Sequence, residues 1–513
     1  MDPVTISDKA FEDLVSKRAQ TLLGLAHYVA NCPTPRDILI RPLLGELLSQ
    51  SLQTEELLDT YDARNNCRWC SFRSSIAGIK WFADVCCELL HIQHALPAYR
   101  LLPIADDFAQ ATDHALEFAA AIVTRASRRL IDKAAELKLP IPKQTGPDES
   151  CADQLPPGRL PHNCATRHIE SAYETVTMLA TTFLNLAAES RDVHAAKGVS
   201  PEKYVFFVAK TITEEKLRAI ELRFHNLQSM YDTYVSGTEA EKTDENLPIL
   251  RGHVSVVFHL LTTATLLAHY YERHVDCVLC EKRAREGHLI TPQELLTALI
   301  DYSLSHISQY ILCAERLCHQ LLKKYIEVDR VQVPIPPYRG FHVRPSTLIS
   351  KLVLHYGSEM KMQINGESYN AASSLDLFRA NEMVNARKRR RLAAEIDHLG
   401  IVPEKPNGTD AKEIIAAVVA KLAERSDLVI YEKPLQMPDE LSSKEGTLLE
   451  QVTDEIARLL AIGKIDITTD VQAIFTGDKR VLADIKLLAE SGYGEDNLGN
   501  NIPLPEKLNF LRR

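Results

Sequence analysis

Residues 340–356 read GFHVRPSTLISKLVLHY, and this stretch decides what kind of domain the C-terminal part of the chain forms. From Arg344 onward, apolar residues recur every three or four positions, which predicts an amphipathic helix. Pro345 suits the first position of a helix, where a missing N–H group removes no hydrogen bond. We therefore expect His342 and Arg344 to lie in the turn just before that helix.

This position makes His342 a candidate acceptor of a phosphoryl group. The first N–H groups of a helix have no internal partners and carry the positive end of its dipole, so an oxyanion on the imidazole would meet them. Arg344 adds a permanent planar cation that suits phosphate. A neutral imidazole is nucleophilic near pH 7. The motif His-x-Arg-Pro alone also fits a helix-start histidine without chemistry, so the surrounding sequence has to decide.

The elements around the motif follow in a distinctive order. VDRVQVPIPPYRG (328–340) predicts a strand that ends in a turn, and SEMKMQINGESYNA (358–371) predicts two short strands around Asn365-Gly366. SLDLFRANEMVNARKRRRLAAEI (374–396) predicts a second helix. With the motif Gly340-Phe341-His342-Val343-Arg344-Pro345, this region resembles the HPr family, the histidine-containing phosphocarriers of the bacterial sugar phosphotransferase system.

The resemblance implies a fold and a site. The fold is an α+β open-faced sandwich, and His342 would take phosphate from enzyme I and pass it to transport proteins or regulators while Arg344 stabilises it. Ser373 falls where many relatives carry a regulatory phosphorylated serine. Asp376 and Arg379 depart from the family, because they stand where an apolar docking surface is usual.

A second departure concerns the fourth strand, which in the family follows the second helix. Here the basic run Arg387–Arg391 and the loop HLGIVPEKPNGTD (398–410) occupy that position. We expect DLVIYE (427–432) to fill the vacant place in the sheet. The basic run is typical of a solvated helix face, and it could also bind an acidic partner.

The first 327 residues have a helical period over long runs, which predicts helix-on-helix packing. A proline-rich polar stretch at 138–163 predicts a linker. Arg73 and His91 have the same separation as Arg251 and His269, which suggests that a four-helix unit is duplicated. The expected helical segments are 9–31, 36–60, 71–95 and 105–137, then 164–190, 201–235, 248–275 and 292–326.

A chain of 513 residues is too long for one core, because single cores stop growing near roughly 250–300 residues. We predict a multidomain protein with an all-α N-terminal region, an HPr-like domain and a helical tail. The expected boundaries are 1–137 for one helical-bundle unit, 138–163 for the linker, 164–327 for the second unit, 328–435 for the HPr-like domain and 436–513 for the helical extension.

Two CxxC pairs suggest a candidate zinc site. Cys67-Arg-Trp-Cys70 and Cys277-Val-Leu-Cys280 each lie near a third helix of the proposed duplication, and two thiolate pairs can hold one tetrahedral zinc ion. Their separation is far longer than in a zinc ribbon, so four ordinary thiols remain the alternative. Four histidines share one expected helix without an i, i+4 pair, and we expect core or surface residues: His253, His259, His269 and His274.

Composition limits the class of protein. The formal net charge of −10 argues against a protein built mainly to bind nucleic acid. The start MDPVTISDKAFEDLV lacks the basic and apolar parts of a signal peptide. The most apolar stretch, 254–271, is interrupted by two histidines, whereas a membrane span needs ~20 mostly apolar residues. We expect a cytoplasmic protein without a membrane span, whose eleven cysteines are thiols or metal ligands.

Three hypotheses follow. The first is a phosphotransferase-system protein that carries or senses phosphate on His342, with an enzyme I-like donor, an acceptor or regulator as partner, and no cofactor for the transfer. The second is a scaffold that keeps the HPr fold without phosphorylation, and the third is a zinc-binding helical protein. No Walker A, HExxH or GxSxG motif appears, which favours a phosphocarrier over an independent catalyst.

Overall fold

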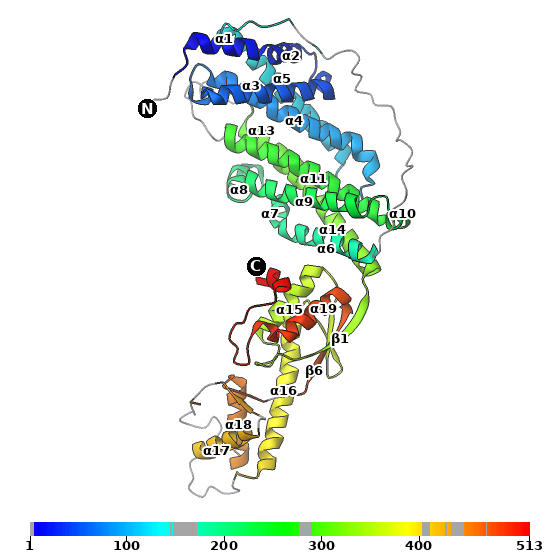
Figure 1. The fold of residues 1–513 in the computed structure, drawn as a ribbon, viewed down its shortest axis with the longest axis vertical. Coiled ribbons are helices and arrows are strands. Elements are labelled where there is room, and N and C mark those ends of the chain that lie inside the picture. Colours follow the sequence, from blue (N-terminus) through cyan, green and yellow to red (C-terminus); the bar gives the residue numbers. More distant parts are fainter. Residues whose placement is uncertain are drawn as a thin grey trace. The chain divides into compact units, whose positions relative to one another are not determined.

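The computed structural model describes residues 5–143, 146, 172–275, 289–402, 411–425, 428–431, 434–435, 446–467 and 469–512. The chain divides into two compact units, Met1–Leu321 (unit 1) and Leu322–Arg513 (unit 2). The described residues are mostly helical, with small antiparallel sheets in unit 2, as the sequence predicts in outline (Figure 1).

Unit 1 is built from helices. Its long helices are α1 (Asp8–Arg18), α2 (Gln20–Ala30), α3 (Arg41–Thr60), α4 (Cys70–Tyr99), α5 (Phe108–Glu136), α6 (Ala172–Glu189), α9 (Glu214–Tyr234), α11 (Asn246–Tyr270) and α14 (Ser305–Tyr325), whose last turn begins unit 2. Its shorter helices are η1 (Pro35–Ile38), η2 (Ala63–Asn65), α7 (Arg191–Ala196), η3 (Pro201–Lys203), α8 (Tyr204–Thr211), α10 (Glu239–Thr243), η4 (Tyr271–Val275), α13 (Pro292–Thr297) and η5 (Ala298–Leu304).

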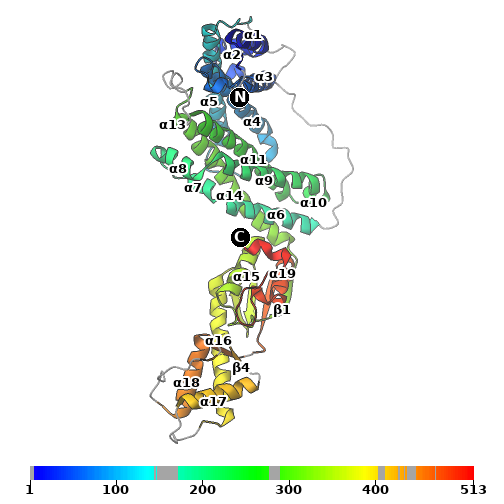
Figure 2. The same ribbon diagram turned by 60° about the vertical axis from the view of Figure 1, so that its left-hand side comes forward.

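The helices of unit 1 stack side by side (Figures 1 and 2). Helix α4 packs against α3, α5 and α11, and α11 packs in turn against α9. Gly252 permits one close approach, because a Cβ there would lie 1.8 Å from the backbone oxygen of Tyr99. The two halves that the sequence separates therefore share one packed body. The stretch Asn246–Val275 is long and apolar enough to cross a membrane, and 72% of its apolar window is buried inside the unit.

The arginines that the proposed duplication aligns make similar contacts. Arg73 of α4 binds both carboxylate oxygens of Asp59 in α3, at 2.8 and 2.7 Å. Arg251 of α11 binds both oxygens of Asp232 in α9, at 2.6 and 2.8 Å. Each pair ties a long central helix to the long helix before it, which is consistent with a duplicated helical hairpin.

Unit 2 contains a four-stranded antiparallel sheet with the order β1-β6-β2-β3. Its strands are β1 (Val328–Pro334), β2 (Lys361–Ile364), β3 (Glu367–Asn370) and β6 (Gln472–Asp478), and the helices packed with it are α15 (Val343–Tyr356), α16 (Ser374–Leu399) and α19 (Lys479–Glu490). The short helices η6 (Gly492–Gly494) and η7 (Glu506–Arg512) follow α19. Strand β6 is central, since Phe475 pairs with Val331 of β1 and with Met362 of β2.

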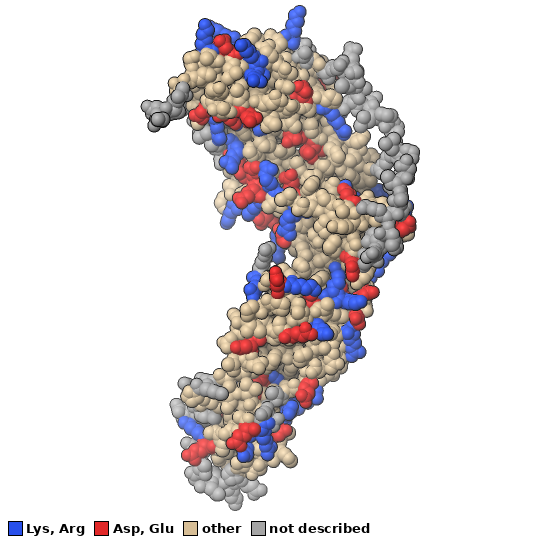
Figure 3. Space-filling model, viewed as in Figure 1, with Lys and Arg blue, Asp and Glu red and all other residues tan. Residues whose placement is uncertain are grey.

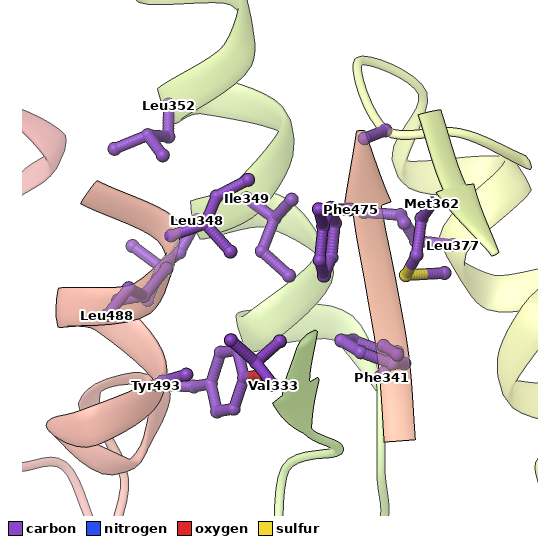
Figure 4. Packing of buried hydrophobic residues seen from close by; sticks show 14 of the residues in the cluster. Val333, Phe341, Leu348, Ile349, Leu352, Met362, Leu377, Phe475, Leu488 and Tyr493 are labelled. Carbon is purple, nitrogen blue, oxygen red and sulfur yellow. The ribbon is translucent and has the colours of Figure 1, made fainter. Parts of the chain in front are cut away.

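The helices cover one face of this sheet. Alternate strand residues enter the core, including Val333, Met362 and Phe475, whereas Lys361 and Gln363 of β2 are exposed. Figure 4 shows the strand side chains meeting Ile349 of α15 and residues of the other helices. This alternation is the pattern of an antiparallel sheet with one covered face.

An inserted subdomain separates α16 from β6. It contains α17 (Ala411–Glu424), β4 (Leu428–Ile430), α18 (Leu448–Ala461) and β5 (Ile465–Ile467). The second half of α16 belongs to its core through Leu392 and Ile396, so this helix joins both cores (Figure 2).

The prediction that DLVIYE supplies the fourth strand of the sheet is wrong. Its described residues form β4, which pairs with β5 in a separate two-stranded sheet. Strand β6, from the tail predicted to be a helical extension, occupies the place between β1 and β2. The physical reason is which core each strand joins: Ala473 and Phe475 of β6 are completely buried in the core of the four-stranded sheet, whereas Leu428 of β4 is buried in the core of the inserted subdomain.

Candidate functional site

A tight turn after β1 positions His342. Arg339 and Gly340 have φ angles of +55° and +64°, a conformation that favours glycine. The side-chain amide of Asn381 in α16 donates to the backbone oxygen of Arg339 at 3.1 Å, and Phe341 is fully buried. The turn is therefore fixed on both sides, which determines where the next residue, His342, projects.

His342 is the residue that begins α15, because it occupies the N-cap position and Val343 is the first helical residue. The helix thus starts two residues earlier than Pro345, where the sequence placed it. Arg344 consequently lies in the first turn of the helix rather than before it. Pro345 is still tolerated, since no N–H group of the first turn has an intrahelical acceptor.

The loop after α19 supplies a carboxylate to this histidine. Glu495, only 8% exposed, places its two carboxylate oxygens 3.2 and 3.3 Å from His342 Nε2. Gly494, at φ +76°, and a backbone bridge between Glu495 and Asn501 shape the loop. We call residues 491–502 the C-terminal loop.

The same loop reaches Arg344. The guanidinium Nη1 donates to the Oδ1 atom of Asn501. The Nε atom is buried without a hydrogen-bond partner, and it forms an ion pair with Glu495, whose Oε1 lies 3.8 Å away. A buried donor that lacks a hydrogen bond is costly, so an oxygen closer than that of Glu495 would be stabilised at this atom.

Both ring nitrogens of His342 face acceptors. Nδ1 lies 3.1 Å from the backbone oxygen of Gly340, and Nε2 faces Glu495. A carbonyl and a carboxylate can only accept hydrogen bonds, so both contacts are satisfied together only when both nitrogens carry protons. A doubly protonated ring is not a nucleophile, so acceptance of a phosphoryl group would require one of the two contacts to open.

Tyr338 completes the surroundings of the histidine. Its ring contacts that of His342 edge-on, with centroids 5.4 Å apart. The C-terminal loop also approaches this tyrosine, because a Cβ at Gly499 would lie 2.5 Å from the Tyr338 ring. His342 nevertheless keeps 22% of its side chain exposed, and the neighbouring Val343 is 67% exposed.

Ser373, the candidate regulatory serine, is the N-cap of α16. Its hydroxyl accepts a hydrogen bond from the backbone N–H of Asp376 at 3.2 Å. Asp376 forms an ion pair with Arg379 at 3.5 Å, and Leu375 is 59% exposed. The hydroxyl thus has a structural role in capping, and its phosphorylation stays a hypothesis.

The two CxxC pairs are only partly within the described residues. Cys67 is exposed before α4, and Cys70 is buried at the first position of that helix. Cys277 and Cys280 lie outside the described residues, so the shared zinc site stays a hypothesis. Within the described part of the chain, no group of three or more His, Cys, Asp or Glu side chains is placed to hold a metal ion.

The histidines of α11 pack inside unit 1. His259 Nδ1 lies 2.8 Å from a carboxylate oxygen of Glu88, and His269 Nδ1 lies 2.9 Å from one of Glu214. His253 is fully buried, and this burial lowers its pKa. These contacts join neighbouring helices of the unit.

Sequence reasoning missed Glu495 and Asn501. The segment GYGEDNLGNN (492–501) predicts a turn, because glycine and asparagine dominate it. Nothing in its composition indicates where that turn packs. Comparison of the chain with protein-family models, with curated proteins and with solved structures gives no match. The site is therefore interpreted from its own geometry.

Proposed function

We propose that the chain is a phosphocarrier or phosphorylation-dependent regulator with an HPr-like module. In this proposal His342 accepts a phosphoryl group from an enzyme I-like donor, and the helical unit 1 serves as the output or docking part. The resemblance of the GFHVRP motif supports the proposal. The strand order β1-β6-β2-β3 supports it too, since β6 supplies the fourth strand that the resemblance implies, after an insertion.

The observation that carries the proposal is the buried Nε of Arg344, which has no hydrogen-bond partner beside the N-cap histidine. A phosphoryl group on His342 would bring oxygens to this donor and to the first backbone N–H groups of α15. These groups would stabilise negative charge without further rearrangement of the helix.

The phosphoryl transfer needs no reactant besides His342 and the phosphoryl donor. A neutral ring nitrogen of His342 attacks phosphorus, a nitrogen–phosphorus bond forms, and the bond from phosphorus to the donor breaks. The donor keeps the bonding electron pair. Phosphate and the Glu495 carboxylate are both negative and both suit Arg344, so the C-terminal loop has to withdraw Glu495 as the phosphoryl group arrives.

Labelling tests the proposal. The full chain, incubated with phosphoenolpyruvate and enzyme I, is expected to acquire an acid-labile phosphate that His342→Ala removes. His398→Ala is the matched control, because His398 is exposed on α16 and outside the site. Equal labelling of His342→Ala and the wild type would refute the proposal.

A scaffold that keeps the fold without phosphorylation is the second candidate. Glu495 favours it, because this carboxylate already satisfies His342 Nε2 and lies beside Arg344. The scaffold function predicts no label in the wild type or in a variant that lacks the Glu495 charge, together with unchanged biological output of His342→Ala.

A further inference from the structure

A polar cavity of about 390 Å³ lies in unit 2 where the inserted subdomain returns to the sheet. Positive and negative side chains are interspersed over the visible face in Figure 3, so charge alone does not single out a binding surface. The cavity is distinctive because it gathers two arginines of the basic run with amide and hydroxyl side chains and one carboxylate. Its polar lining includes Gln332, Arg387, Arg391, Thr469, Asp470 and Gln472.

The two arginines are placed to share one anion. Arg387 and Arg391 are four residues apart on α16, a spacing that puts side chains on the same helix face. Asn365, at the β2–β3 turn, accepts a hydrogen bond from Arg387 Nη1 at 2.7 Å and holds that guanidinium at the cavity. Each guanidinium group can donate two parallel hydrogen bonds to the oxygens of a phosphate, so two neighbouring arginines suit a phosphate group.

The other basic residues of the run differ from these two arginines, although Lys388 also lines the cavity. Lys388 is buried, and both oxygens of Asp466 lie 2.8 Å from its Nζ atom, so its charge is neutralised within the protein. Arg389 and Arg390 are exposed and do not line the cavity. The cavity is therefore lined by the ion-paired Lys388, by the exposed Arg387 and by the half-buried Arg391, whereas Arg389 and Arg390 lie outside it.

The opposite side of the cavity suits hydroxyl groups. Gln332 and Gln472 offer amide donors and acceptors, and Asp470 offers a carboxylate that accepts hydrogen bonds. A carboxylate repels a ligand that is anionic throughout, but it binds the neutral hydroxyl groups of a ligand that is anionic at one end. The cavity volume falls within the range of small-molecule sites, about 300–1,000 Å³.

We propose that this cavity binds a small phosphate monoester that carries hydroxyl groups. Arg387 and Arg391 hold the phosphate, and Asp470 with the neighbouring amides holds the hydroxyl end. This site is separate from His342 and does not depend on phosphoryl transfer. Because α16 and residues 469–472 both line it, a bound ligand connects the inserted subdomain's return segment to the sheet.

Calorimetric titration of the full chain with ribose 5-phosphate, ribose and inorganic phosphate tests this inference. Saturable binding of ribose 5-phosphate, at least tenfold tighter than binding of inorganic phosphate, is expected, whereas ribose alone should give no binding. The double variant Arg387→Gln/Arg391→Gln is expected to weaken ribose 5-phosphate at least tenfold. Absence of saturable binding by the wild type would overturn the proposal.

The matched control is Arg389→Gln/Arg390→Gln, which removes the same charge from the same helix outside the cavity. It is expected to bind within twofold of the wild type. Equal loss in the two double variants would refute a built site, since it would indicate general attraction to the basic helix. Asp470→Asn should reduce the preference for ribose 5-phosphate over inorganic phosphate, and an unchanged preference would refute the role of Asp470. Thermal unfolding of each variant verifies its fold.

Discussion

The substitution Glu495→Gln separates the charge of the C-terminal loop from its shape. Glutamine has nearly the size of glutamate and can still bind His342 Nε2, but it carries no charge. A phosphoryl group on His342 would lie a few ångströms from this side chain, because Nε2 is 3.2 Å from the nearer carboxylate oxygen. We therefore expect Glu495→Gln to increase phosphorylation of His342.

The magnitude follows from Coulomb's law. Two unit charges 4 Å apart interact by about 4 kcal/mol at an effective dielectric of 20 and about 1 kcal/mol in water. Glu495 has 7% of its side chain exposed and His342 has 22%, so the site lies between these limits. We expect the substitution to favour the phosphorylated form by about 1.5–3 kcal/mol, which is at least tenfold.

The assay measures the ratio of phosphorylated to free chain at equilibrium with phosphorylated enzyme I. Glu490→Gln is the control, because Glu490 carries the same charge on an exposed position of α19. The control should match the wild type, and high salt should narrow the difference between Glu495→Gln and the wild type. Lower phosphorylation of Glu495→Gln would refute the reasoning, since it would make Glu495 a group that assists the transfer.

Three further changes test the fold and its charges. Phe341→Ala should lower the free energy of unfolding by about 3–5 kcal/mol in a denaturant titration, because Phe341 is fully buried, whereas Val343→Ala should change it by less than about 0.5 kcal/mol. Lys388→Ala should lower the free energy of unfolding by about 3–5 kcal/mol, because it leaves the buried Asp466 carboxylate without its ion-pair partner. A smaller decrease in the double variant Lys388→Met/Asp466→Leu would identify the unpaired charge as the cause. Burial raises the pKa of Asp84 from 3.8 to about 6, so between these pH values the folded state binds a proton that the unfolded state has lost, and the free energy of unfolding falls as pH rises from about 4 to about 6. Asp84→Asn should remove this dependence of the free energy of unfolding on pH and stabilise the protein by about 1–3 kcal/mol at pH 7. An unchanged pH dependence in the variant would contradict the assignment to Asp84.

The sequence predicts the local elements well because their signals are local. Asn365 and Gly366 adopt φ angles of +52° and +88°, and β2 pairs with β3 across them, as an Asn-Gly hairpin requires. Helix periodicity likewise locates the long helices of unit 1. His342 lies at a helix start, as expected, although the helix begins at Val343.

Strand partners cannot be predicted in the same way. In the segment QAIFTGD (472–478), Ile474 interrupts the alternation of apolar and polar residues, and DLVIYE is closer along the chain to the other strands. Closing a longer loop costs little additional free energy, since the cost grows only with the logarithm of loop length. An insertion between α16 and β6 is therefore tolerated, and burial of Phe475 rather than proximity decides which strand pairs.

The position of the C-terminal loop follows from that same strand. Since β6 is central and α19 follows it, the chain returns beside β1, where the hydroxyl of the buried Tyr493 donates to the backbone oxygen of Pro334 at 2.6 Å. Leu504 and Leu508, which follow the loop in the chain, are also buried. Both ends of the loop are thus anchored in the core. In the middle of the loop, Asn500 donates hydrogen bonds to the Asp496 carboxylate, and these hydrogen bonds lower the pKa of Asp496. Withdrawal of Glu495 from His342 would therefore break the polar contacts of the loop and the approach of Gly499 to the Tyr338 ring, while the apolar anchors and the sheet can stay in place.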